Sequence, residues 1–91
     1  RLSIELRNEA QIIYHVLKMS KEKFLTHSIS EIKTLIGNMF DQSPAFILEY
    51  FEIADESTLK IADEKQKNTT YRAFIAVKVD GIRLIDNLSL N

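Results

Sequence analysis

Residues Tyr71 to Asn87, YRAFIAVKVDGIRLIDN, contain the pattern that decides the fold. Two apolar-rich runs flank Asp80-Gly81, a dipeptide that tolerates the positive φ angles required at both central positions of a type I′ turn. The pattern therefore predicts a two-residue β-hairpin, whose loop length also fixes the register. The predicted cross-strand partners are Val79 with Ile82, Val77 with Leu84, Ile75 with Asp86, Lys78 with Arg83 and Ala76 with Ile85.

A hairpin alone is marginally stable in water, so the preceding chain must cover its apolar stripe. A first amphipathic helix is predicted from an N-cap at Ser3 to about Ser20. Its apolar stripe consists of Leu6, Ala10, Ile13 and Leu17, widened by Ile12, Val16 and Met19.

A second helix is predicted after Ser28, which forms a capping box with Glu31. Its apolar positions follow helical spacing, and the residues before Pro44 end it. Gly37 weakens its interior and suggests close packing there. The apolar stripe of this helix is Ile32, Leu35, Ile36, Met39 and Phe40.

Residues Phe46 to Ala54 are expected to form an interior strand that is partly covered on both faces. In a regular strand Glu49 and Glu52 point to opposite faces, so they are not expected to act together on one bond. If this strand neighbours the hairpin, the two carboxylates can offset the like charges of Lys78 and Arg83.

The remaining segments connect these elements. Asp55 is expected to cap a turn, Thr58–Ala62 to add a short edge strand, Asp63–Thr70 to form a solvated loop and Leu88–Asn91 to form a tail. The sequence thus predicts one α+β domain over residues 1–91, with two helices packed on a small antiparallel sheet of about three strands that ends in a β-hairpin.

Composition limits the possible functions. The net charge is −1, which argues against a nucleic-acid partner, and no apolar run approaches the length of a membrane span. The chain has no cysteine, so disulfides and thiolate metal sites are excluded and a cytoplasmic location is expected. The residues assign no catalytic, cofactor-binding or metal-ligating position.

Two features resemble functional motifs without their context. Lys18-Met19-Ser20-Lys21 matches the start of a nucleotide-binding loop of class I aminoacyl-tRNA synthetases, but it falls at a helix end and lacks the second, His-x-Gly-His signature. His15 and His27 stand alone in the sequence and are interpreted as surface residues rather than metal ligands.

The segment Arg83-Leu84-Ile85-Asp86-Asn87 resembles the carboxy-terminal signature of the pantothenate synthetase (pantoate–β-alanine ligase) family. Pro44 followed by LEYFEIAD, and then Asp55-x-x-Thr58-Leu59, is similar to the strand and turn at the same distance from that family's end. The opening Arg1-Leu2-Ser3 resembles the segment that follows the family's Ser-Ser-Arg-Asn motif. Ile4 and Glu5 depart from the family's usual proline and acid.

The resemblance implies the lid-like carboxy-terminal domain of a two-domain enzyme, with an amino-terminal Rossmann-like domain as its partner. In the family, ATP, Mg²⁺ and pantoate give a pantoyl-adenylate and pyrophosphate, and β-alanine then displaces AMP to give pantothenate for coenzyme A synthesis. The 91 residues alone are expected to be inactive, since the nucleotide motif lies upstream of Arg1.

Three alternatives remain open at the level of sequence. The chain is a lid domain that can also associate as a homodimer, a free-standing interaction or dimerisation module, or a nucleotide-binding domain built on Lys18–Lys21. Arg83 and Lys78 are interpreted as a cross-strand pair buffered by glutamate rather than as phosphate ligands. Asp86 and Asn87 are expected to bond nearby backbone.

Overall fold

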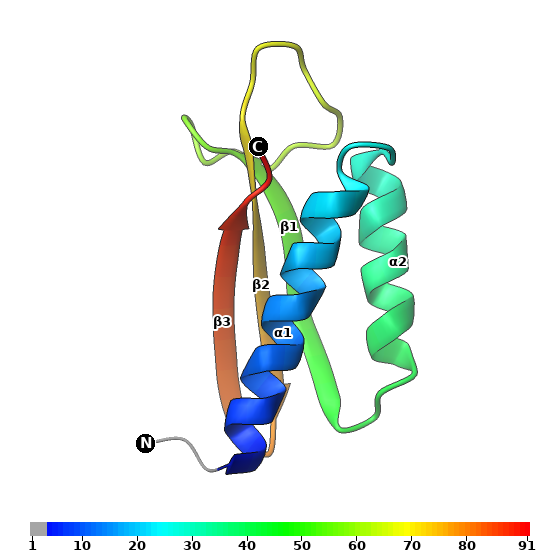
Figure 1. Ribbon diagram of the computed structural model, residues 1–91, viewed down its shortest axis with the longest axis vertical. Helices are drawn as coiled ribbons and strands as arrows, with labels where there is room; N and C mark the ends of the chain where they lie inside the picture. The colour runs from blue at the N-terminus through cyan, green and yellow to red at the C-terminus, as the bar shows by residue number, and fades with distance from the viewer. Residues whose placement is uncertain (1–3) are drawn as a thin grey trace.

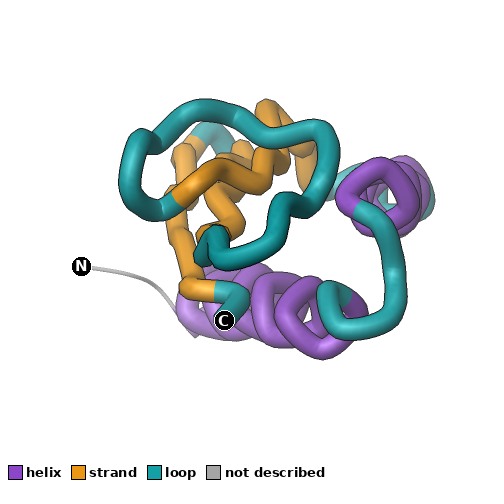
Figure 2. Tube along the Cα trace, turned by 90° about the horizontal axis from the view of Figure 1, so that it is seen from above, coloured by secondary structure: helices purple, strands orange, loops and turns teal. Residues whose placement is uncertain are grey.

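The structure is a computed structural model that describes residues 4–91, and it has the α+β class that the sequence predicts (Figure 1). Two helices, α1 (Ile4–Lys23) and α2 (Ile29–Asp41), precede three strands. The strands β1 (Phe46–Asp55), β2 (Tyr71–Val79) and β3 (Ile82–Ser89) form one antiparallel sheet in the order β1-β2-β3. The helices lie against one side of this sheet (Figures 1 and 2).

The hairpin has the predicted register in all five pairs, from Val79 opposite Ile82 to Ile75 opposite Asp86. Asp80 and Gly81 have φ angles of 53° and 77°, as a type I′ turn requires. The turn chemistry visible in the sequence therefore sets which side chains of β2 and β3 face the helices.

The position of β1 differs from its prediction. β2 is the central strand and β1 is an edge strand. The high apolar content of β1 reflects α2 on one side and apolar residues of the following loop on the other, rather than a second neighbouring strand along its length.

A β-bulge between Leu48 and Tyr50 further changes which residues of β1 share a face. Phe51 and Ile53 are buried toward the helices, and Leu48 packs against the same core. Ile47, predicted to share their face, is instead exposed. The extra residue reverses the alternation in the first part of the strand.

The helices match their predicted positions more closely. α1 ends at Lys23, three residues beyond the predicted Ser20, while the predicted cap Ser3 lies outside the described residues. Ile13, Val16 and Leu17 are buried, but Ile12, included in the predicted stripe, is 45% exposed. The buried stripe of α1 is therefore narrower than the set of apolar residues from which it was predicted.

In α2 the predicted capping box is confirmed. The Ser28 hydroxyl accepts from the Glu31 amide at 3.1 Å, and the Glu31 carboxylate accepts from the Ser28 amide at 2.8 Å. Ile32, Ile36 and Phe40 are buried, whereas Met39 is exposed. The prediction of close packing at Gly37 is wrong, because a Cβ added there would meet nothing within 4 Å.

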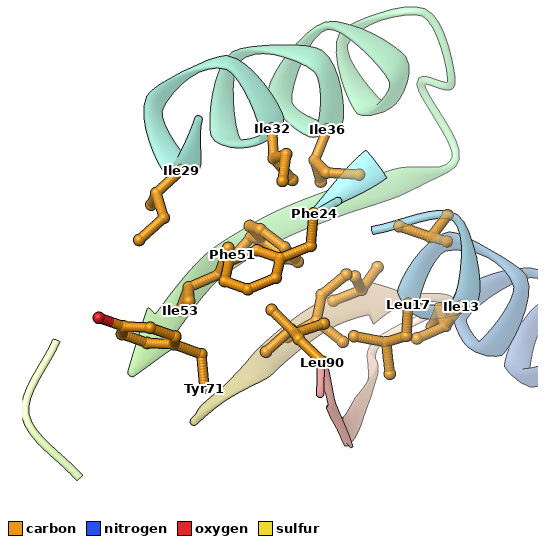
Figure 3. Close-up of a cluster of buried hydrophobic side chains, with 14 of the residues drawn as sticks. Ile13, Leu17, Phe24, Ile29, Ile32, Ile36, Phe51, Ile53, Tyr71 and Leu90 are labelled. Carbon is orange, nitrogen blue, oxygen red and sulfur yellow. The ribbon is translucent and has the colours of Figure 1, made fainter. Parts of the chain in front are cut away.

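The core lies between the helices and the helix-facing side of the sheet (Figure 3). Phe24, just after α1, stacks at a tilt on Tyr71 of β2, with ring centroids 5.6 Å apart. Leu90 is buried among these side chains, so the predicted carboxy-terminal tail is wrong: β3 continues to Ser89 and the next residue completes the core. The labelled core residues in Figure 3 are Ile13, Leu17, Phe24, Ile29, Ile32, Ile36, Phe51, Ile53, Tyr71 and Leu90.

The loop between β1 and β2 pairs briefly with β1. The predicted edge strand at Thr58–Ala62 is reduced to one bridge, Ala54 with Ile61, supported by backbone bonds that Ala62 donates to Ile53 and Asp55 donates to Lys60. The polar segment that follows is exposed, as predicted, and arches over the end of the sheet (Figures 1 and 2). Lys65 anchors it by a hydrogen bond to the Phe24 carbonyl and lies over the Phe24 ring.

Candidate functional site

The side of the sheet away from the helices carries an apolar hollow near the end of β1. Its walls combine strand residues with two residues of the following loop, Leu59 and Ile61, which are 66% and 61% exposed. We call the side of the sheet away from the helices the open face, and its concave part near the end of β1 the apolar hollow. The hollow is lined by Tyr50, Glu52, Ala54, Leu59, Ile61 and Phe74.

Local hydrogen bonds fix Leu59 in this position. The Asp55 carboxylate accepts from the amides of Ser57 and Thr58, at 2.7 and 3.3 Å, as expected for a capped turn. The Leu59 amide donates to the Asp55 carbonyl at 2.7 Å, and Leu59 has a φ of 61°. Positive φ is costly for a leucine, so the turn holds an apolar side chain outward in a strained backbone conformation.

One end of the open face carries a charge pair across the sheet. Arg83 Nε of β3 donates to Glu49 Oε1 of the β1 bulge at 2.5 Å. The predicted offset of the hairpin charges is therefore confirmed for Glu49 and Arg83, whereas Glu52 pairs with Lys33 instead. The bulge positions Glu49 for this bond, a role that regular alternation does not reveal.

A second polar network crosses the sheet near its other end. Arg72 of β2 donates to the Glu56 carboxylate at 3.1 Å and to the Asn87 side-chain oxygen at 2.6 Å. The Ser89 hydroxyl donates to the other Glu56 oxygen at 3.2 Å. The prediction for Asn87 is wrong, because its side-chain oxygen accepts from Arg72 and not from nearby backbone, whereas the Asp86 carboxylate accepts from a neighbouring amide, as predicted.

Glu52 is held from the helical layer. Lys33 of α2 donates to Glu52 Oε1 at 2.7 Å, beside the free edge of β1. The prediction that Glu49 and Glu52 point to opposite faces is wrong, because Glu49 is the extra residue of the bulge. Glu52 lines the apolar hollow, and Glu49 reaches Arg83 on the same side of the sheet. The two carboxylates nonetheless pair with different basic side chains, Glu49 with Arg83 and Glu52 with Lys33.

The tetrapeptide Lys18–Lys21 lies entirely inside α1. The Ser20 side chain is fully buried, and its hydroxyl donates to the Val16 carbonyl at 2.9 Å. A nucleotide-binding loop needs this hydroxyl and its backbone accessible to phosphate, so the helix excludes the nucleotide interpretation of these residues.

The remaining titratable groups form no candidate metal site within the described part of the chain. Over residues 4–91, no group of three His, Cys, Asp or Glu side chains is placed to hold a metal ion. His15 is exposed on α1, and His27 shares a hydrogen bond with the neighbouring Thr26 hydroxyl. The pKa of Glu31 is lowered, chiefly by the hydrogen bond that its carboxylate accepts from the Ser28 amide. This shift is a consequence of the helix cap and does not indicate a catalytic group.

The sequence analysis missed the apolar hollow. Tyr50 and Phe74 were visible as strand residues, but the turn that brings Leu59 and Ile61 beside them depends on the Asp55 carboxylate and on one bridge to Ala54. Two large aliphatic residues in an otherwise polar loop were the available signal.

No helix among the described residues is sufficiently long and apolar to cross a membrane. The fold is that of a small α+β domain whose two helices cover one side of the sheet and leave the open face uncovered by helices. Comparison with known families then identifies it: residues 1–89 match the pantoate–β-alanine ligase family, and the chain belongs to that family.

Similar proteins agree with this family. The pantothenate synthetases of Christiangramia forsetii and Flavobacterium psychrophilum are 48% and 47% identical to the chain, over 100% and 99% of its length. A crystal structure of pantothenate synthetase from Thermus thermophilus matches with a TM-score of 0.77 at 27% identity, covering 98% of the chain. The chain spans 32% of the length of each of these proteins and corresponds to a carboxy-terminal portion.

Proposed function

We propose that this chain is the lid domain of an ATP-dependent ligase that joins pantoate to β-alanine in the cytoplasm. The observation that carries the proposal is the family match over residues 1–89, together with relatives near 48% identity that cover the whole chain. The active site would then lie mainly in the other two thirds of the polypeptide, in an amino-terminal Rossmann-like domain.

The proposed reaction has two steps. A pantoate carboxylate oxygen attacks the α-phosphorus of ATP, and the bond to pyrophosphate breaks. The β-alanine amine then attacks the acyl carbon of the pantoyl-adenylate, AMP leaves with the bonding electron pair and the nitrogen loses a proton to give the amide.

The contribution of this domain is to cover that site. An acyl-adenylate is lost to hydrolysis if water reaches it, so a rigid cover protects the intermediate and strengthens electrostatic interactions beneath it. A sheet backed by two helices and tied across by the Glu49–Arg83 pair is suited to move as one body.

A chimera tests the proposal. The 91 residues replace the matching third of the Christiangramia forsetii enzyme, and pantothenate, AMP and pyrophosphate are measured with pantoate, β-alanine and ATP. We expect all three products in equal amounts. A folded chimera that forms none of them, beside an active parent enzyme, would contradict the proposal and favour the alternative of an interaction or dimerisation module.

A further inference from the structure

We propose that the open face, including the apolar hollow, is the surface by which this domain docks on the amino-terminal two thirds of its own ligase polypeptide. This inference rests on the proposed function and adds to it the face that makes the contact. The alternative contact surface is the outer side of the two helices, which faces the opposite way (Figure 2).

The first argument is the apolar surface. Leu59, Ile61 and Ile85 are each at least 60% exposed on the open face or at its margin, and Tyr50 and Phe74 lie between them at the hollow. An exposed apolar patch with an aromatic centre is typical of a contact surface. The strained φ of Leu59 maintains this exposure, although a leucine in free solution would favour another conformation.

The second argument is the state of the charges. On the open face Arg83 is paired with Glu49, and Arg72 with Glu56 and Asn87, so a partner can cover these two arginines without leaving either unpaired. The exposed Lys78, which lies opposite Arg83 on this face, would need an acceptor from the partner. The outer face of α1 instead exposes Lys18, Lys21 and Glu22 to solvent. Covering those side chains would remove their hydration, which makes α1 the less suitable contact.

The third argument concerns the occupant. The chain accounts for 32% of the length of its relatives and corresponds to their carboxy-terminal portion, so in them a polypeptide about twice as long precedes the equivalent of α1. The first turns of α1 lie beside the β2–β3 turn, at one end of the sheet (Figure 1). A domain joined there is held at high effective concentration near this end of the sheet, so a patch of modest size suffices.

Cysteine labelling of the chimera tests this inference. The chain has no cysteine of its own, so Ile85→Cys on the open face and Ile12→Cys on the outer side of α1 each add one site within it. The two isoleucines are 60% and 45% exposed, which makes them a matched pair. Maleimide labelling of each position is followed by peptide mass spectrometry, with and without ATP and pantoate.

We expect position 85 to react about tenfold more slowly than position 12 in at least one of the two conditions, because the docked domain shields it. Equal rates in both conditions, or slower labelling at position 12, would overturn the inference. Protection of position 85 that is lost on dilution would show that a second copy covers the face, and would also overturn it.

A charge substitution gives an independent readout. Ile85→Glu is expected to lower pantothenate formation by the chimera about tenfold, whereas Ile12→Glu leaves it unchanged. A chimera that forms pantothenate but responds equally to both substitutions would retain the proposed function and refute the docking face. An inactive chimera would refute the proposed function instead, while labelling still reports which face is covered.

Discussion

Single side chains fix the ends of the elements in this domain. Ser28 and Glu31 satisfy each other's backbone amides at the start of α2, and Asp55 does the same for the turn after β1. Both were visible in the sequence because a cap depends on residues close together in the chain. Ser20 shows the converse, since four residues that resemble a motif form an ordinary turn of α1 in which the Ser20 hydroxyl is buried and bonded to the Val16 carbonyl.

The Glu31 carboxylate makes the stability of α2 depend on pH. Its pKa is lowered below the ordinary 4.5, chiefly by the Ser28 amide, so the folded state favours the ionised form. The resulting stabilisation is complete above the ordinary pKa of the unfolded chain and is lost as the pH falls through the lowered folded value.

We therefore expect Glu31→Gln to lower the melting temperature at pH 7, and the difference from the unmodified protein to vanish at acid pH. Thermal unfolding of both proteins at a series of pH values from 7 down to acid pH measures this difference in melting temperature. Glu22→Gln, which removes an exposed carboxylate outside the capping box, is the control. Equal effects of the two substitutions at pH 7 would contradict the assigned role of the cap.

At the scale of elements, the register of the hairpin is determined by residues next to one another in the chain, whereas the register of β1 is not. The Asp80-Gly81 turn sets the register of β2 and β3 from two residues. The bulge at Glu49 has no comparable local signal: it depends on Arg83, which lies 34 residues later in the chain. For this reason the faces of the hairpin could be predicted, whereas the first part of β1 was assigned to the wrong face and β1 itself to the wrong place in the sheet.

The two glycines give a matched test of this local chemistry. Gly81 has a φ of 77°, so Gly81→Ala is expected to destabilise the domain by about 1 kcal/mol or more. Gly37 lies within α2 with open space around an added Cβ, so Gly37→Ala is expected to stabilise it by about 1 kcal/mol. Urea denaturation measures both; shifts of the same sign would contradict the assigned geometry.

At the scale of the whole molecule, the chain closes its core with its last described residues. The Leu90 amide donates to the Tyr71 carbonyl at 2.8 Å, and the Tyr71 amide donates to the Asn91 side-chain oxygen at 2.6 Å. The sequence analysis predicted only a tail here, although Leu88 and Leu90 alternate with Ser89 as in a strand and were an available signal. The family resemblance, carried in part by Arg83–Asn87 just before these residues, was confirmed over residues 1–89, since identity depends on many matched positions together.

Leu90 should therefore behave as a core residue. It is only 3% exposed, and Leu90→Ala is expected to lower the free energy of unfolding by about 2–5 kcal/mol. Leu59→Ala removes the same atoms from an exposed position and is expected to change it by less than about 0.5 kcal/mol. Comparable losses for the two variants would contradict the core shown in Figure 3.

The place of β2 between two partners has a consequence for synthesis on the ribosome. This central strand emerges before β3, so its buried apolar side chains and one row of backbone groups wait unpaired until residues 82–90 have left the exit tunnel. A frameshift or stop codon shortly after Gly81 would release a product with that edge permanently bare. Such a product is expected to collect in inclusion bodies or be degraded, even though every residue of both helices has been translated correctly.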